Sequence, residues 1–237
     1  GVEPLQHRGP PLHDRGPLLG QSPQRIGRAV TGDPVVGMRF ITHGLVPAKL
    51  VDHAGLVVLG GRMGAEDDTE HRWLLPTRAL VAATVASGRP FLGVCLGHQI
   101  ATVALGGRVT PNPHGSTRAL VPFGATDEGR RDALTSALPD RAPVLHWNND
   151  VAVELPAGAV RLASAPDGTV QAARFGPSAW GVQFHPEVDA GIVSRWARGD
   201  EPAAEQETLA ALRSRRQELH RAWEALIRRF ARIALVA

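Results

Sequence analysis

Residues 88–109, GRPFLGVCLGHQIATVALGGRV, contain the single cysteine of the chain and decide its fold class. The apolar run PFLGV at 90–94 predicts a buried strand, and HQIATVALGG at 98–107 predicts a helix that ends in glycine. Cys95 stands in the turn between them, with Gly93 two residues before it and Gly97 two residues after it. A buried strand that leads directly into a helix indicates an α/β protein.

The same alternation of strand and helix extends over residues 51–198. The run AGLVVLGG at 54–61 predicts a strand, and PTRALVAATVAS at 76–87 predicts a helix with proline in its first turn. We expect a three-layer α/β fold with a mostly parallel central sheet and helices on both faces. The later strands follow one another quickly, which indicates an antiparallel part. They are predicted at 117–123, 142–147, 158–165, 169–175 and 179–184.

Two further segments flank this predicted domain of residues 51–198. Residues 1–50 are irregular and rich in Gly, Pro, His and Arg, and we expect residues 1–36 to be poorly ordered and to lie outside the sheet. Residues 200–237 have the pattern of one long amphipathic helix. This helix can pack on its own domain or can dock on a partner. Its apolar stripe consists of Leu209, Leu212, Leu219, Trp223, Leu226, Phe230 and Ile233.

The composition excludes several classes of protein. The net charge is only +3, Lys49 is the single lysine, and the arginines are dispersed, so nothing indicates a nucleic-acid partner. One cysteine excludes an intramolecular disulfide framework. No apolar run approaches the length of a membrane span, and no signal peptide is recognised. We therefore expect a cytoplasmic protein without a membrane partner.

Cys95 admits two interpretations. A strand, a turn of the form Gly-x-Cys-x-Gly and a helix are the parts of a nucleophile elbow, in which the central residue is strained and its neighbours must be small. The N-terminus of the helix would favour a thiolate, and the N–H of Leu96 could donate to an oxyanion. Alternatively, Cys95 is a small buried apolar residue.

The segment WGVQFHPEV at 180–188 supplies a candidate base for a cysteine nucleophile. Pro186 disfavours helix for the residue before it, and side chains two residues apart in an extended segment point to the same side. The carboxylate of Glu187 can therefore orient the imidazole of His185. Together, the cysteine turn and this pair favour the catalytic interpretation of Cys95.

The two motifs, with GLVVLGGRMG and VLHWNNDV, closely resemble the triad-type glutaminase domains of class I glutamine amidotransferases over residues 50–198. The resemblance implies a triad of Cys95, His185 and Glu187, and an oxyanion hole formed by the N–H groups of Gly61 and Leu96. It also implies that Gln99 and Asp150 bind the substrate. No metal or organic cofactor is implied.

The resemblance implies hydrolysis of the glutamine side-chain amide through a cysteine thioester, with ammonia released for an acceptor that the sequence does not identify. The chain can then be an amidotransferase subunit that works with a separate synthetase subunit, or a stand-alone glutaminase-like protein. The sequence also departs from the family pattern. It reads NPHGSTRALV where a Glu-x-Gly usually contacts glutamine, Asn148 and Asn149 stand where His-Gly is common, and no first strand precedes residue 40. Two alternatives therefore stay open: a hydrolase of other γ-glutamyl amides or peptides, and a non-catalytic binding protein.

Overall fold

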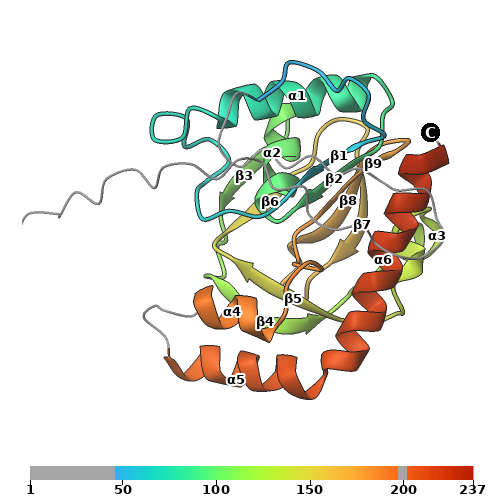
Figure 1. The fold of residues 1–237 in the computed structure, drawn as a ribbon. Helices are drawn as coiled ribbons and strands as arrows, with labels where there is room; N and C mark the ends of the chain where they lie inside the picture. The colour runs from blue at the N-terminus through green and yellow to red at the C-terminus, as the bar shows by residue number, and fades with distance from the viewer. Residues whose placement is uncertain (1–45, 197–201, 237) are drawn as a thin grey trace, which may run out of the picture. The chain divides into compact units, whose positions relative to one another are not determined.

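The computed structural model describes residues 46–196 and 202–236 (Figure 1). The predictions for residues 1–36, and nearly all of the predicted segment 1–50, lie outside the described residues. The helices and strands, in chain order, are β1 (Leu56–Val58), α1 (Leu74–Ala86), β2 (Phe91–Val94), α2 (Leu96–Ala104), β3 (Arg108–Pro111), β4 (Thr117–Pro122), α3 (Asp127–Arg131), η1 (Thr135–Ala137), β5 (Pro143–Asn148), β6 (Asp150–Glu154), β7 (Val160–Ser164), β8 (Val170–Gly176), β9 (Ala179–Val182), α4 (Ala190–Trp196), α5 (Pro202–Ser214) and α6 (Arg216–Val236).

The central sheet has five strands in the order β1-β2-β9-β8-β7. β2 pairs in parallel with β1 on one side and with β9 on the other, whereas β8 pairs antiparallel with both β9 and β7. The predicted α/β fold with an antiparallel part is confirmed, and the sheet is mixed. β2 lies between two parallel neighbours, so its four residues are buried as the apolar run PFLGV predicts.

Alternate residues of the central strands pack into two different hydrophobic clusters. Phe91 contacts the cluster formed with α1 and α2, which includes Leu74 and Ile100. Leu92 and Val94 contact the larger cluster on the opposite face. That cluster contains apolar side chains of β4, β5 and the C-terminal helices. The period-2 alternation of the strands thus divides the core into the two interlayer spaces of a three-layer fold.

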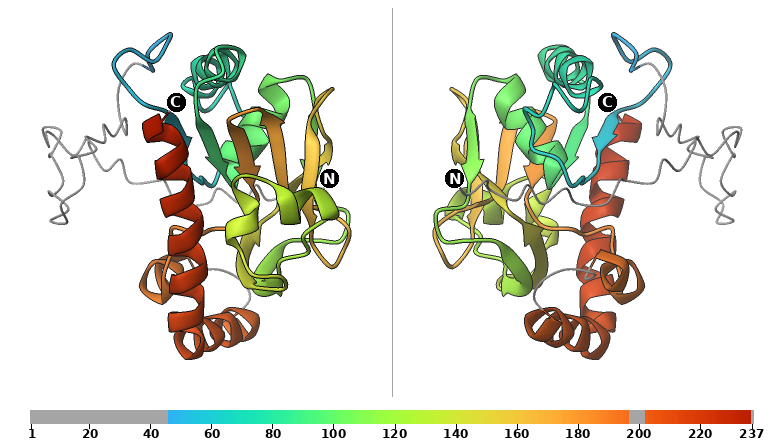
Figure 2. Two further views of the ribbon diagram at one scale, coloured as in Figure 1. Left: turned by 90° about the vertical axis from the view of Figure 1, so that its right-hand side faces the viewer. Right: turned by 90° about the vertical axis from the view of Figure 1, so that its left-hand side faces the viewer.

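The C-terminal region contains two helices, not the single helix that the sequence pattern predicts. α5 and α6 run in different directions and meet at Arg215 (Figures 1 and 2). α5 packs on β4, where Thr208 donates a hydrogen bond to the carbonyl oxygen of Arg118. α6 packs beside η1, and Arg229 of α6 donates to the carbonyl oxygen of Ala133. No glycine or proline lies between 203 and 236. The bend therefore follows from packing on two different parts of the domain.

The apolar stripe of both C-terminal helices is buried within the large cluster of their own domain. Leu226 is fully buried, and Trp223 and Phe230 are each only 6% exposed. This arrangement agrees with the interpretation that the stripe packs on its own domain. Because each such side chain contributes about 1.5–3 kcal/mol on burial, the two helices contribute substantially to stability.

Two short antiparallel ladders complete the described fold and differ from the sequence expectations. β4 pairs with β5 as two predicted apolar runs, whereas β3 and β6 pair although neither was predicted. Asp150 therefore begins a strand. α1 begins at Leu74, two residues before the predicted start, with Pro76 still in the first turn where no helical N–H bond is lost.

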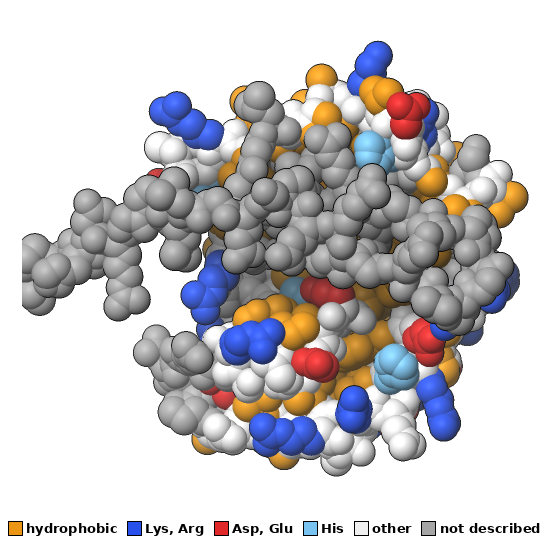
Figure 3. All heavy atoms as spheres, viewed as in Figure 1, with side chains coloured by type: hydrophobic (Ala, Val, Ile, Leu, Met, Phe, Trp, Pro, Cys, Tyr) orange, Lys and Arg blue, Asp and Glu red, His pale blue; other side chains and the backbone are white. Residues whose placement is uncertain are grey.

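In the view of Figure 3, the basic side chains of the described residues are interspersed with acidic and apolar ones. In that part of the chain no helix combines the length and apolar character that crossing a lipid bilayer requires.

Candidate active site

Cys95 connects β2 to α2 in a strained conformation. Its φ of 49° and ψ of −105° lie in a region that favours glycine and costs a residue with a side chain about 1–3 kcal/mol. Its N–H donates to the carbonyl oxygen of Val182 on β9 at 2.8 Å, so the sheet holds the strained residue in place. Cys95 is 5% exposed and stands at the N-terminus of α2, where backbone N–H groups lack helical partners.

The two glycines that flank Cys95 are needed for close packing. A Cβ on Gly93 would lie 2.5 Å from the backbone of Gly97, and a Cβ on Gly97 would lie 2.0 Å from the carbonyl oxygen of Val58 on β1. Both contacts involve backbone atoms that cannot move aside easily. The Gly-x-Cys-x-Gly spacing therefore lets β1, β2 and the start of α2 meet at Cys95.

His185 follows β9 and faces the end of β2. Its Nδ1 lies 2.7 Å from Oε1 of Glu187, the contact that the spacing of two residues predicts. Burial opposes a charge on His185, but hydrogen bonds to Cys95 and Glu187, and the charges of both groups, raise its pKa to about 10. The imidazole is therefore protonated at neutral pH.

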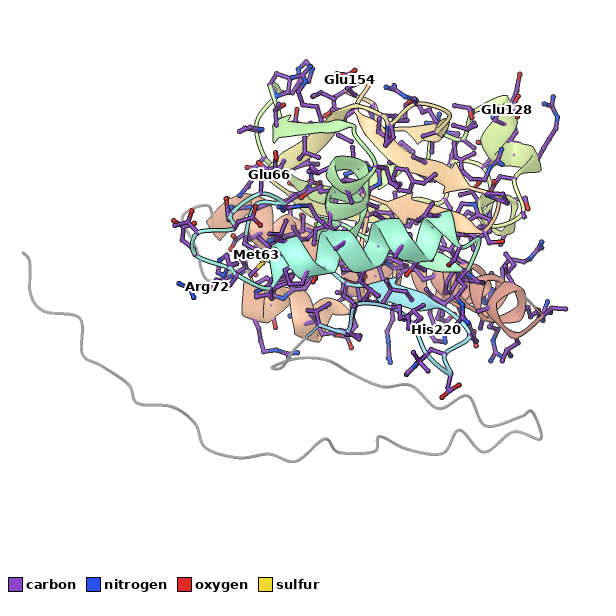
Figure 4. All side chains as sticks on the ribbon, turned by 90° about the horizontal axis from the view of Figure 1, so that it is seen from above. Met63, Glu66, Arg72, Glu128, Glu154 and His220 are labelled. Atoms are coloured by element: carbon purple, nitrogen blue, oxygen red, sulfur yellow. The ribbon has the colours of Figure 1, made fainter. Side chains whose placement is uncertain are left out.

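The glycine pair after β1 reaches this group of side chains. A Cβ on Gly60 would lie 2.7 Å from Cε1 of His185 and 3.6 Å from Cβ of Cys95. A Cβ on Gly61 would lie 2.6 Å from both Cδ2 of Leu96 and Sδ of Met63. Figure 4 shows Met63 on the loop that leads from β1 to α1, together with Glu66 and Arg72. The chain from Gly60 to Met63 thus lies along the turn that carries Cys95.

The backbone N–H groups of Gly61 and Leu96 donate no hydrogen bond to any other described residue. Leu96 is the first residue of α2, where an N–H has no helical acceptor. The two residues are adjacent, because Gly61 packs on the side chain of Leu96. Two N–H groups without a hydrogen-bond partner among the described residues therefore lie next to Cys95.

Gln99 and Asp150 lie together. Nε2 of Gln99 donates to the carbonyl oxygen of Asp150 at 2.9 Å and to Oε1 of Gln183 at 3.3 Å. Burial raises the pKa of the Asp150 carboxyl, and the nearby Asp67 carboxylate raises it further. Gln99 is also in the first turn of α2, where its N–H donates to the carbonyl oxygen of Cys95. The pair therefore lies one helical turn from Cys95.

The two buried histidines near this region carry no charge at neutral pH. Burial lowers the pKa of His98 to about 4, and its ring stacks on Phe175 in the interior. Burial likewise lowers the pKa of His146 to about 4, against smaller opposing effects of Asn148 and Asp167. Within residues 46–196 and 202–236, no group of three or more His, Cys, Asp or Glu side chains is placed to hold a metal ion.

Sequence reasoning missed three residues at this site. Gly60 touches His185, Gln183 contacts Gln99, and the indole of Trp196 lies with its ring centroid 4.9 Å from that of His185. The paired glycines and the QFHPE run were visible signals for the first two. Trp196 gave no such signal, because its contact with His185 depends on how α4 folds back.

A family model provides the comparison that decides the family. The model described as glutamine amidotransferase class-I matches residues 41–193, which is more than half of the chain. The chain belongs to this family. Cys95, His185 and Glu187, which the structure brings together, all lie inside the matched residues of this class I amidotransferase.

Individual relatives are similar over part of their length. The chain is 42% identical over 103 residues to a glutamine-hydrolysing GMP synthase subunit of Saccharolobus solfataricus, covering 42% of this chain and 51% of the relative. It is 33% identical over 135 residues to γ-glutamyl-L-1-hydroxyisopropylamide hydrolase of a Pseudomonas species, covering 52% of this chain and 45% of the relative. The chain thus spans about half the length of each.

A solved structure agrees with the fold. The glutamine amidotransferase of Methylobacillus flagellatus aligns with a TM-score of 0.67 and 26% sequence identity, covering 76% of this chain and 76% of that chain. The similarity covers most of both chains, and so supports the mixed α/β architecture described above.

Proposed function

We propose that this class I amidotransferase hydrolyses a γ-glutamyl amide, first of all the side-chain amide of glutamine, with Cys95 as nucleophile. The observation that carries the proposal is the strained Cys95 beside an imidazole whose Nδ1 lies 2.7 Å from Glu187. In this proposal the carboxylate of Glu187 orients the imidazole and stabilises its charge.

The first half of the reaction forms a thioester. The Cys95 sulfur attacks the amide carbon, and the negative charge on the carbonyl oxygen is stabilised by the N–H groups of Gly61 and Leu96. The protonated His185 then donates its proton to the departing amide nitrogen, so the carbon–nitrogen bond breaks and ammonia leaves. The raised pKa of His185 supports this role, because the proton is present at neutral pH.

The second half releases the acid. Neutral His185 accepts a proton from water as the water oxygen attacks the thioester carbon, and the carbon–sulfur bond breaks to give glutamate and Cys95. Gln99 and Asp150 are proposed to bind the amino-acid end of the substrate. Asp67, whose charge raises the pKa of the Asp150 carboxyl, adds a second acidic group in this region. Two acidic groups favour a substrate with a free ammonium group.

The proposed domain organisation assigns this chemistry to residues 51–198, with residues 200–237 as a helical extension. A separate synthetase subunit that uses the ammonia is also proposed, by analogy with the relative named as one subunit of a GMP synthase.

A second substrate class is favoured by two observations. The loop NPHGSTRALV departs from the family pattern at a glutamine contact, and one relative is named as a hydrolase of a γ-glutamyl alkylamide. The same sulfur, base and oxyanion donors would then release an alkylamine in place of ammonia.

The experiment compares glutamine with γ-glutamyl isopropylamide as substrates for the purified chain and measures glutamate release. Cys95→Ala and His185→Ala are expected to abolish release, because the members of such a triad act as a unit. Glu187→Gln is expected to lose less, because it orients the imidazole without transferring a proton. Undiminished glutamate release by Cys95→Ala would exclude the mechanism, and the ratio of kcat/KM values for the two substrates decides the substrate class.

A further inference from the structure

The imidazole of His185 has an aromatic neighbour in addition to Cys95 and Glu187. The ring of Trp196, the last residue of α4, has its centroid 4.9 Å from that of His185 and is tilted 61° to it. The same imidazole abuts Gly60, where a Cβ would lie 2.7 Å from Cε1. The ring is thus held by Glu187 at Nδ1, by Gly60 at Cε1 and by the indole of Trp196.

α4 is anchored so that Trp196 returns to His185. Asp189 caps the start of the helix, because its Oδ1 accepts the N–H of Ile192 at 2.8 Å. Val188 and Val193 are buried in the large hydrophobic cluster, 5% and 0% exposed. The Asp189 cap and the two buried valines fix the segment that follows His185, so that α4 brings Trp196 back to the imidazole of His185.

A series of contacts connects Trp196 to the first C-terminal helix. The ring of Trp147 on β5 lies 6.2 Å from that of Trp196, and the guanidinium of Arg118 lies 5.8 Å above Trp147. Arg118 in turn pairs with the buried carboxylate of Glu205 on α5 at 3.4 Å. The indole next to His185 is therefore part of a series of aromatic and ionic contacts that extends to the first C-terminal helix.

We propose that Trp196 is a positioning residue that holds the imidazole of His185 in line with Cys95 and stabilises the imidazolium form. This inference rests on the proposed role of His185. Tilted aromatic pairs at this distance are attractive, and a cation within about 6 Å of an indole ring is stabilised by its negative face.

The ionisable groups that face His185 set the direction of the effect. Cys95 at the start of α2 and Glu187 in the following loop favour the charged imidazole. The charge of His185 lowers the pKa of His146 on β5, and burial, the larger effect, keeps His146 neutral at neutral pH. Loss of the indole therefore removes a stabilising contact from the imidazolium, so the pKa of His185 should fall.

The test uses Trp196→Leu and Trp196→Phe, with Trp223→Phe as the matched control. Trp223 is a buried indole of the large cluster against which the partly buried Trp196 packs, but it lies on α6 and its Nε1 has no hydrogen-bond partner among the described residues. Four quantities are measured: kcat and KM for glutamate release, the rate of iodoacetamide alkylation of the single cysteine at pH 7, and the pKa of His185 from its NMR titration.

Trp196→Leu is expected to lower kcat and the alkylation rate by roughly two- to tenfold, the factor that corresponds to one aromatic contact, with KM nearly unchanged. The NMR pKa of His185 should fall. Trp196→Phe should recover most of the loss, and Trp223→Phe should change thermal stability alone. If Trp196→Leu is too unstable to study, Trp196→Phe must still show a smaller loss of the same kind.

The proposal is overturned if the Trp196 variants change thermal stability alone and leave the alkylation rate and the His185 titration as in the native chain. Alkylation and NMR need no substrate, so they test the contact even if the chain hydrolyses neither γ-glutamyl amide. Failure of the proposed function and failure of this inference are therefore distinguishable.

Discussion

Replacement of Gly60 by alanine is a sharp test of the active-site geometry, because it adds one methyl group next to His185. The new Cβ would lie 2.7 Å from Cε1 of His185. Gly60 is exposed and its φ is outside the left-handed region, so alanine adds no backbone strain. The perturbation is therefore confined to the imidazole.

The expected magnitude follows from the distance. Carbon atoms in contact lie about 3.5–4.0 Å apart, so the imidazole must retreat by about 1 Å. It cannot do so freely, because Nδ1 is bound to Glu187 at 2.7 Å and the ring contacts Trp196. A misplacement of about 1 Å can cost about 10²-fold in rate, which is about 2.7 kcal/mol of transition-state stabilisation.

The assay measures kcat for glutamate release and the midpoint of thermal unfolding for Gly60→Ala and for the control Gly176→Ala. A Cβ on Gly176 would lie 3.4 Å from Val85 and 3.7 Å from Ala179, both ordinary contacts. We expect Gly60→Ala to unfold at nearly the native temperature with kcat lowered about 10²-fold. The control should keep native kcat. A native kcat in Gly60→Ala would refute the assignment of His185 as the group that transfers the proton.

Three further predictions concern stability. Leu226→Ala should lower the free energy of unfolding, measured by urea titration, by about 2–5 kcal/mol, because Leu226 is fully buried in the large cluster. A change below about 1 kcal/mol would contradict that packing. Removal of residues 200–237 should yield insoluble or unfolded protein, since the apolar stripe covers the domain core; a soluble fragment with native circular dichroism would make these helices a docking element. The free energy of unfolding should also fall as the pH decreases from about 6.5 to about 4. In this range the unfolded chain binds protons at His98 and His146 that the folded chain excludes, because burial lowers the pKa of both imidazoles to about 4. The expected loss is up to about 3 kcal/mol for each of the two histidines. His98→Phe should flatten this pH dependence, and an unchanged slope would show that His98 is not responsible.

The parts of the fold and site that sequence predicts are those encoded by short, local patterns. The strand, turn and helix around Cys95 depend on neighbours within a few residues, and so does the contact between His185 and Glu187. Apolar runs such as PFLGV are buried on both sides, so they are recognisable from hydrophobicity alone. The roles of these residues in catalysis stay a prediction.

The parts that sequence could not predict depend on packing between distant segments. β3 and β6 have mixed exposure and therefore no clear apolar run. The bend at Arg215 has no glycine or proline to mark it, because it arises where α5 and α6 pack on different elements. The contact of Trp196 with His185 likewise requires the return of α4, which no local pattern encodes.

The most direct test of Cys95 as the nucleophile is mass spectrometry of the chain after reaction with a diazoketone analogue of glutamine. Such a compound alkylates a nucleophile that attacks the γ-carbonyl position. We predict one adduct per chain, on the peptide that contains Cys95, at a rate that His185→Ala greatly reduces and excess glutamine slows. Absence of an adduct on Cys95, or labelling that is unaffected by both His185→Ala and glutamine, would contradict the assignment of Cys95 as nucleophile.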